Sequence, residues 1–137
     1  MPGGYFFKAL GQWTDYKTRA RRAEFWIYTV VYWLIEVFAL AITAMVVNSA
    51  LDSDTMTLDV GAVTPVGWIC IAVTLGLGLI LWFPWFAVGV RRMHDLGRSG
   101  WWMVLYFTPL FIVIWIMALI GGQPITNQYG PDPKGRG

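Results

Sequence analysis

The sequence carries few side chains of the kinds that catalyse reactions. His94 and Asp95 are adjacent and Ser99 follows within six residues, so the residue types of a Ser-His-Asp triad are present. The members of such a triad normally converge from distant parts of a fold, which makes this spacing weak support for a hydrolase. The chain has a single histidine and a single cysteine, Cys70, which excludes a His-rich or Cys-cluster metal site. We therefore predict no enzyme activity, no cofactor and no metal.

Glu36 lies near the middle of a long apolar block. A carboxylate at membrane depth costs on the order of a few kcal/mol and by default marks a functional site, such as a cation site or a proton relay. The alternatives are a protonated acid that bonds a hydroxyl or indole of a neighbouring helix, or a tilted helix that brings Glu36 to a wet interface. We favour these alternatives, because the blocks contain few other polar groups from which to build a transport path.

Two basic segments flank the apolar blocks, and their arginines are the strongest candidates for binding. Arginine forks suit phosphate oxygens, and clusters of 4–8 basic residues beside a membrane span are typical of anionic-lipid sites. We expect one basic ring around the helix ends, with Glu24 and Asp95 paired to some of the arginines. A purely topogenic role for the positive charges is the alternative. The predicted lipid or partner contacts are Arg19, Arg21, Arg22, Glu24, Arg91, Arg92, His94, Asp95, Arg98, Trp101 and Trp102.

The elements that must position these residues are helices in a membrane. Of the 137 residues, 57 % are hydrophobic and only 13 % charged, far below the charge of a soluble domain. Three apolar blocks cover about 25–47, 66–90 and 101–120. About 20 residues cross a hydrocarbon core as a helix, and hydrocarbon offers no other partner to the backbone. The prediction is an all-α integral membrane protein, one domain over 1–137, with three transmembrane helices.

The distribution of charge predicts the orientation. The segment 1–24 and the loop after the second block are rich in Lys and Arg. The segment between the first two blocks has no Lys or Arg, and its charged residues are Asp52, Asp54 and Asp59. The positive-inside rule then places the N-terminus in the cytoplasm. Net charge is only +2, which gives no support for nucleic acid. The first block exceeds the apolar core of a signal peptide and contains Glu36, so we expect it to be retained.

Both ends of the chain carry further predictions. Tyr5, Phe6 and Trp13 fall on one face at helical spacing, which indicates a short interfacial helix at the N-terminus. Thr108-Pro109 interrupts the third block, and proline kinks a helix. We favour a kinked third span over a re-entrant hairpin, which puts the tail, 121–137, outside. Glycines and prolines make that tail an extended segment, either a docking strand or disordered.

Three motifs together carry a resemblance to a known family. They are Tyr16-Lys17-Thr18-Arg19-Ala20-Arg21-Arg22-Ala23-Glu24-Phe25-Trp26, the run from Arg91 to Trp102 (RRMHDLGRSGWW), and Asn127-Gln128-Tyr129-Gly130-Pro131-Asp132-Pro133. In this order they resemble domain-of-unknown-function family 805, small bacterial inner-membrane proteins of the YhaH type. Thr18, Met93 and Ile125 depart locally from the family pattern. The resemblance implies the fold and the inner membrane, and it implies no activity.

These observations predict a non-catalytic accessory or assembly subunit. It would pack against a larger membrane complex, respiratory, photosynthetic or other, and against anionic lipid. The alternatives are a homo-oligomeric small transporter or channel that uses Glu36, and a membrane sensor that acts through the basic loop.

Overall fold

The computed structural model describes residues 2–50 and 57–136, apart from the side chains of residues 2, 3 and 49. The described residues are helical, with turns and one isolated β-bridge between Asn127 and Gly130. Their contacts separate into two compact units: 1–31 with 82–137, and 32–81. Below these are called the charged unit and the two-helix unit, because all ten Lys and Arg residues lie in the first. Each unit is described by itself.

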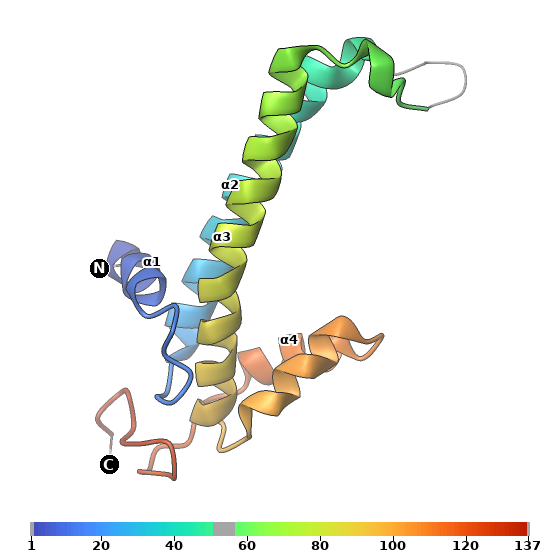
Figure 1. Ribbon diagram of the computed structural model, residues 1–137. Coiled ribbons are helices and arrows are strands. Elements are labelled where there is room, and N and C mark those ends of the chain that lie inside the picture. Colours follow the sequence, from blue (N-terminus) through green and yellow to red (C-terminus); the bar gives the residue numbers. More distant parts are fainter. Residues whose placement is uncertain (1, 51–56, 137) are drawn as a thin grey trace. The chain divides into compact units, whose positions relative to one another are not determined.

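Two helices are long and apolar enough to cross a membrane. Helix α2 runs from Arg22 to Val47 and α3 from Pro65 to Asp95, 26 and 31 residues. At 1.5 Å per residue these are about 39 and 46 Å long, more than the roughly 30 Å of a hydrocarbon core. The first two predicted blocks are therefore single helices, as Figure 1 shows. Their apolar composition without a strong polar stripe is typical of helices that face lipid.

The ends of α3 are encoded locally. Thr64 Oγ1 accepts a hydrogen bond from Gly67 N at the start, and Pro65 occupies the first helical position, where proline is tolerated. At the other end Gly97 adopts φ +72°. Its N–H bonds His94 O, and Arg98 N bonds Met93 O, which together form a Schellman motif. This stop fixes the direction in which the chain leaves α3.

The predicted third span is not a continuous helix, which corrects the sequence-based expectation. A 3₁₀ helix, η3, covers Gly100–Phe107, and α4 covers only Phe111–Leu119. Nine residues make about 14 Å of helix, less than half of a hydrocarbon core. The break falls at Thr108-Pro109, where Thr108 Oγ1 bonds Leu105 O. Together η3 and α4 form a hairpin that leaves the end of α3 and returns to it (Figure 1). The return is marked by the hydrogen bond from Gln123 N to Asp95 O, at 2.9 Å.

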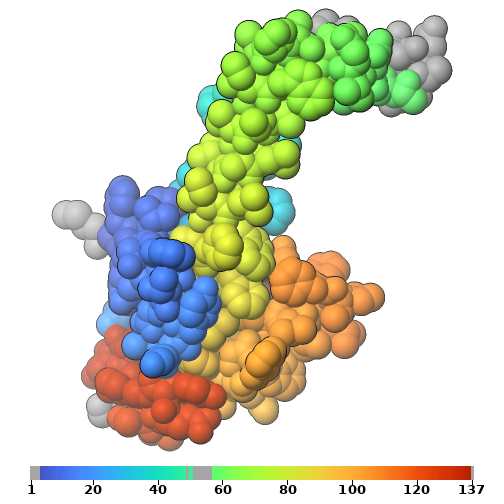
Figure 2. Space-filling model, in the orientation of Figure 1, coloured from blue at the N-terminus to red at the C-terminus, as the bar shows by residue number. Residues whose placement is uncertain are grey.

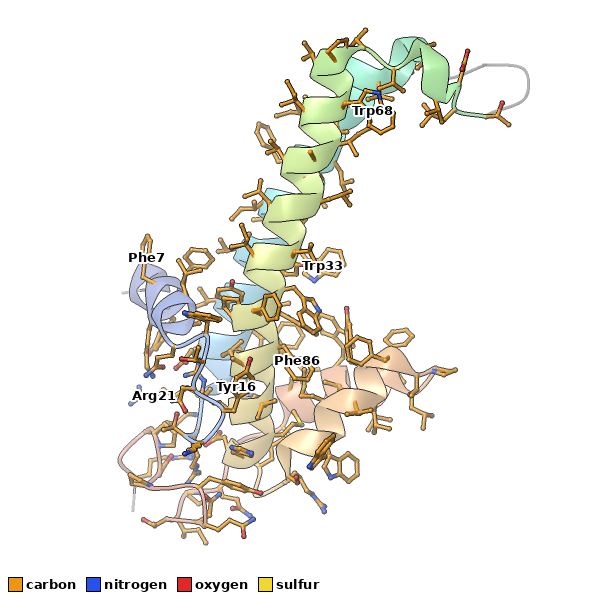
Figure 3. All side chains as sticks on the ribbon, in the orientation of Figure 1. Phe7, Tyr16, Arg21, Trp33, Trp68 and Phe86 are labelled. Atoms are coloured by element: carbon orange, nitrogen blue, oxygen red, sulfur yellow. The ribbon has the colours of Figure 1, made fainter. Side chains whose placement is uncertain are left out.

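The N-terminal helix α1 covers Pro2–Gly11 and packs onto α2 within the charged unit. Ala9 is fully buried, and the Phe6 ring stacks on Tyr28 with centroids 5.1 Å apart. Phe7 is 70 % exposed and points away from the unit (Figure 3). A membrane-interface position for α1 stays a prediction.

The two-helix unit contains the second half of α2 and the first half of α3, which run antiparallel. Thr43 Oγ1 and Thr74 Oγ1 lie 2.8 Å apart, and Thr74 Oγ1 also reaches Ala39 O. Short 3₁₀ turns, η1 (Asn48–Ala50) and η2 (Val60–Ala62), follow α2 and precede α3. Asp59 caps η2 through Gly61 N. Asp52 and Asp54, predicted to face the outside, lie outside the described residues.

Candidate functional site

The first half of the site is a buried ion pair between α2 and α3. Glu24 Oε1 accepts from Arg91 Nη1 at 2.8 Å, and both side chains are fully buried. Arg91 Nη1 also donates to Gln12 Oε1, and Lys8 Nζ bonds the second oxygen of Glu24 at 2.7 Å. Lys8 and Gln12, from α1 and the turn after it, therefore both reach this pair. Because both side chains are fully buried, removing one partner leaves an unpaired buried charge, which makes the pair costly to break.

The second half centres on Asp95. Arg19 donates to Asp95 Oδ1 at 3.0 Å, and Arg92 bonds the other oxygen. Arg92 is fully buried and Arg19 is 5 % exposed. The expected pairing of Glu24 and Asp95 with arginines is therefore confirmed. We call Arg19, Glu24, Arg91, Arg92 and Asp95 the charge lattice.

Backbone carbonyls complete the charge lattice. Its three arginines outnumber its two carboxylates by one positive charge. Arg19 compensates by donating to Gln123 O at 2.6 Å, Ile125 O at 2.7 Å and Gly130 O at 3.1 Å. The tail, predicted to be a docking strand or disordered, is thus folded against the N-terminal segment of its own chain. Figure 2 shows this red segment in contact with the blue one.

The end of α4 supplies further acceptors. The last carbonyls of a helix have no intrahelical partner and carry its negative pole. Ala118 O accepts from Trp26 Nε1 at 3.2 Å, Leu119 O from Arg22, and Ile120 O from Arg92. The short helix α4 is therefore held at its C-terminus by one indole and two guanidinium donors. Arg21, labelled in Figure 3, likewise bonds Pro133 O.

The predicted basic ring is buried at its central members. Arg19, Arg91 and Arg92 are buried in the charge lattice and offer no guanidinium face to lipid phosphate. Arg22 and Arg98 remain exposed. Arg98 lies over the Trp102 ring at 5.6 Å, beside Trp101, which is 81 % exposed. Contact of Arg98, Trp101 and Trp102 with lipid or a partner stays a prediction.

His94, Asp95 and Ser99 do not form a triad. Asp95 is bonded to arginines, and His94 Nδ1 lies 3.2 Å from Thr18 O. Ser99 Oγ accepts from Trp101 N and caps η3. His94 is held instead by its neighbours: its ring stacks on Tyr129 at 3.7 Å, and its carbonyl accepts from Asn127 Nδ2. Within the described residues, no group of three or more His, Cys, Asp or Glu could hold a metal.

A pocket of about 400 Å³ adjoins His94 at the end of α3. Four aromatic side chains and two small residues form much of its wall. Its lining residues are Tyr16, Phe86, Val90, His94, Ser99, Gly100, Trp101, Val104 and Tyr129. Figure 3 shows Tyr16 and Phe86 on neighbouring elements. Sequence reasoning did not find this pocket, because Tyr16 and Tyr129 come from segments distant in the chain.

Hydrogen bonds shift the ionisation of two carboxylates at the rim of the charged unit. Arg136 bonds both oxygens of Asp132 and, with the backbone N–H groups of Lys134 and Arg136, lowers the pKa of Asp132 far below its usual range. The same pair raises the pKa of Arg136. Burial raises the pKa of Asp15, but bonds from the Thr18 hydroxyl and the N–H groups of Lys17 and Thr18 outweigh it and lower the pKa overall. Both carboxylates fix loops that carry lattice or pocket residues.

Glu36 lies in the two-helix unit, opposite Gly78. Both carboxylate oxygens of Glu36 would lie 3.5 Å from a Cβ added at Gly78, so the carboxyl group is close to α3 at this glycine. Oε1 is buried and has no hydrogen-bond partner among the described residues. The carboxyl group therefore lies against the facing helix, as a packing role requires, and leaves one oxygen unbonded, as a transport role requires. Both roles of Glu36 stay predictions.

Fold and site define the class: a small all-helical protein with two candidate membrane spans and a buried lattice of arginines and carboxylates. The model of the family described as "Protein of unknown function (DUF805)" matches residues 13–131, so the chain belongs to that family. The predicted resemblance is thereby confirmed, and the family is not a known enzyme family.

Curated relatives agree over nearly the whole chain. Inner membrane protein YhaH of Escherichia coli strain K12 is 30 % identical over 136 residues, 95 % of this chain and 96 % of the relative. Inner membrane protein YhaI of the same strain is 27 % identical over 132 residues, 95 % of each. No solved structure matches the chain. The protein therefore belongs to the bacterial inner membrane.

Proposed function

We propose that the chain is a non-catalytic accessory or assembly subunit that docks a helix of a larger inner-membrane complex. The observation that carries the proposal is a groove of about 330 Å³ in the two-helix unit. Its lining includes small side chains from both helices: Ala39, Thr43, Cys70 and Thr74. Small residues let helix backbones approach closely in membranes, where packing drives association. Two helices alone cannot cover this surface.

The apolar surface around the groove supports the same proposal. Phe38 is 70 % exposed and Ile69 62 % exposed, and both line the groove. The Thr43 and Thr74 hydroxyls satisfy each other and the Ala39 carbonyl, so the floor requires no polar partner. In the charged unit the lattice side chains bond one another and the tail. That arrangement stiffens the unit and makes these groups unsuited to act on a substrate.

Charge supports a cytoplasmic N-terminus. All ten Lys and Arg lie in the charged unit, whereas the described part of the two-helix unit has the acidic residue Asp59 between its helices. By the positive-inside rule the charged unit faces the cytoplasm. The tail follows on the same side, because Arg19 bonds its carbonyls. Lys134 and Arg136, whose positive charges disfavour an external tail, then lie on the cytoplasmic side as well.

The test is native mass spectrometry after gentle extraction from the native membrane, with Ala39→Phe and Ala41→Phe as matched variants. Ala39 lines the groove, and Ala41 is exposed on the same helix without lining it. We expect a stoichiometric foreign membrane protein that Ala39→Phe loses and Ala41→Phe retains. Equal partner recovery from both variants, or a chain that carries only lipid, would contradict the proposal.

One observation favours a second candidate, a homo-oligomeric transporter. The unbonded Oε1 of Glu36 is the one buried carboxylate oxygen without a partner among the described residues. A clean homo-oligomer in the same experiment would support this candidate. Glu36→Gln should then abolish cation flux in proteoliposomes.

A further inference from the structure

The pocket beside His94 has a defined hydrogen-bonding character. His94 Nδ1 faces Thr18 O at 3.2 Å, and a carbonyl oxygen only accepts. Nδ1 therefore carries the proton, and in the neutral ring Nε2 presents a lone pair. Nε2 is directed towards the pocket lining, since a Cβ added at Gly100 would lie 3.3 Å from it. A ligand that reaches His94 must donate a hydrogen bond.

The walls of the pocket favour a cation as that donor. Tyr16, Phe86, Trp101 and Tyr129 line it together with His94. Aromatic faces attract cations, including quaternary ammonium groups. The wall therefore selects a positive charge, and the lone pair of His94 Nε2 adds the preference for one that carries N–H groups. Asp15, adjacent to Tyr16, adds a negative charge near the rim, and its hydrogen bonds hold it ionised. A primary ammonium has both a positive charge and N–H donors.

The surroundings favour a lipid as the source of the ammonium. A neighbouring depression shares Ser99 and Trp101 with the pocket and is bordered by Trp102, over which Arg98 lies. A guanidinium there is placed for a phosphate next to the ammonium. Val104, which also lines the pocket, is 44 % exposed, and Phe107 further along η3 is 63 % exposed. These apolar side chains offer a path for acyl chains.

We propose that this pocket binds the headgroup of a zwitterionic phospholipid with a primary ammonium, whose N–H groups bond His94 Nε2 and whose phosphate meets Arg98. The volume of about 400 Å³ suits a headgroup and not a whole lipid. Tyr129 closes the wall from the tail and stacks on His94, so the site exists only while the tail is docked. The proposal is independent of the accessory role, because it needs no protein partner.

The test titrates the delipidated full chain with short-chain phosphatidylethanolamine, phosphatidylcholine and phosphatidylglycerol of equal acyl length, read by native mass spectrometry. A quaternary ammonium cannot donate to Nε2, so phosphatidylethanolamine should bind about tenfold more tightly than phosphatidylcholine, the typical effect of one charge-assisted hydrogen bond. His94→Asn keeps a donor near the position of Nδ1 and removes Nε2. It should abolish the preference while both lipids still bind.

A second pair of variants guards against misfolding of His94→Asn. Val104→Trp fills the pocket from an exposed position, and Leu110→Trp makes the same change on the hairpin away from the pocket lining. The first should lose the preference and the second should keep it. Equal binding of ethanolamine and choline lipids by the unmodified chain would overturn the proposal. So would tighter binding of phosphatidylglycerol, or displacement of the lipid by an equal concentration of free ethanolamine.

Discussion

The pair between Glu24 and Arg91 gives the sharpest test of the charge lattice. Glu24→Gln removes the carboxylate charge but keeps its shape, and leaves the fully buried Arg91 with two neutral amide oxygens as acceptors, that of Gln12 and that of the new side chain. Arg91 Nε and Nη2 already have no hydrogen-bond partner among the described residues. A buried charge without its counterion cannot be solvated by relaxation alone. The substitution should therefore destabilise the protein strongly.

The magnitude follows from burial. Removing one partner of a fully buried pair costs about 3–5 kcal/mol of unfolding free energy. The second partner of Glu24, Lys8, is 46 % exposed, so Lys8→Met should cost less than about 1 kcal/mol. Arg91→Gln should cost less than Glu24→Gln, because Glu24 keeps Lys8. The double variant Glu24→Gln/Arg91→Gln should recover most of the loss, because no unpaired buried charge remains.

The assay is reversible denaturant unfolding in mixed micelles, followed by the near-ultraviolet circular dichroism of the tryptophans. The four proteins form a double-mutant cycle, whose coupling energy isolates the pair. We expect a coupling of about 2 kcal/mol or more. Additive single effects would refute the reasoning, since they would mean that the two charges are separately hydrated and not paired in a dry interior.

Three further predictions address the tail and the hairpin. Gly122→Ala should release the tail, because a Cβ there would collide with the Asp95 carboxylate, whereas Gly121→Ala, in open space, should be silent; limited proteolysis of the C-terminus measures both, and equal cleavage would contradict the docked arrangement. In a Cys70→Ser background, single cysteines at exposed Lys17 and Gln128 should react with an impermeant reagent from the same side of the membrane, whereas labelling from opposite sides would restore the third span. Finally, the pKa of Asp132 is lowered in the folded state, so its contribution to tail docking is fully present above its unfolded pKa of about 4 and is lost only as the pH falls below that value. The anisotropy of a fluorophore on Lys134→Cys should stay constant from about pH 8 to 5, and Arg136→Gln should shift the loosening to higher pH; a transition near neutral pH would contradict this assignment.

The charged pairs were predictable only in part. Two acidic residues beside two arginine clusters indicated that Glu24 and Asp95 would be paired, and they are. The sequence could not indicate which arginines would be buried, because burial depends on segments that meet in space. Gln12 and Asn127 were missed for the same reason. Asn127 lies in a motif that carried the family resemblance, so the sequence marked this residue but did not indicate its hydrogen bonds.

What the sequence by itself determined is the membrane class, the family and the two long helices. Sustained apolar runs leave the backbone no partner except itself, so hydropathy and length suffice to predict α2 and α3. Tertiary structure decided the fate of the third block, for which the break at Thr108-Pro109 allowed either a kinked span or a re-entrant hairpin. Its return is fixed by arginines that bond the end of α4 and the tail. Hydropathy measures the free energy of transferring each residue between water and an apolar phase. It contains no information on which distant carbonyls will accept hydrogen bonds from a buried guanidinium.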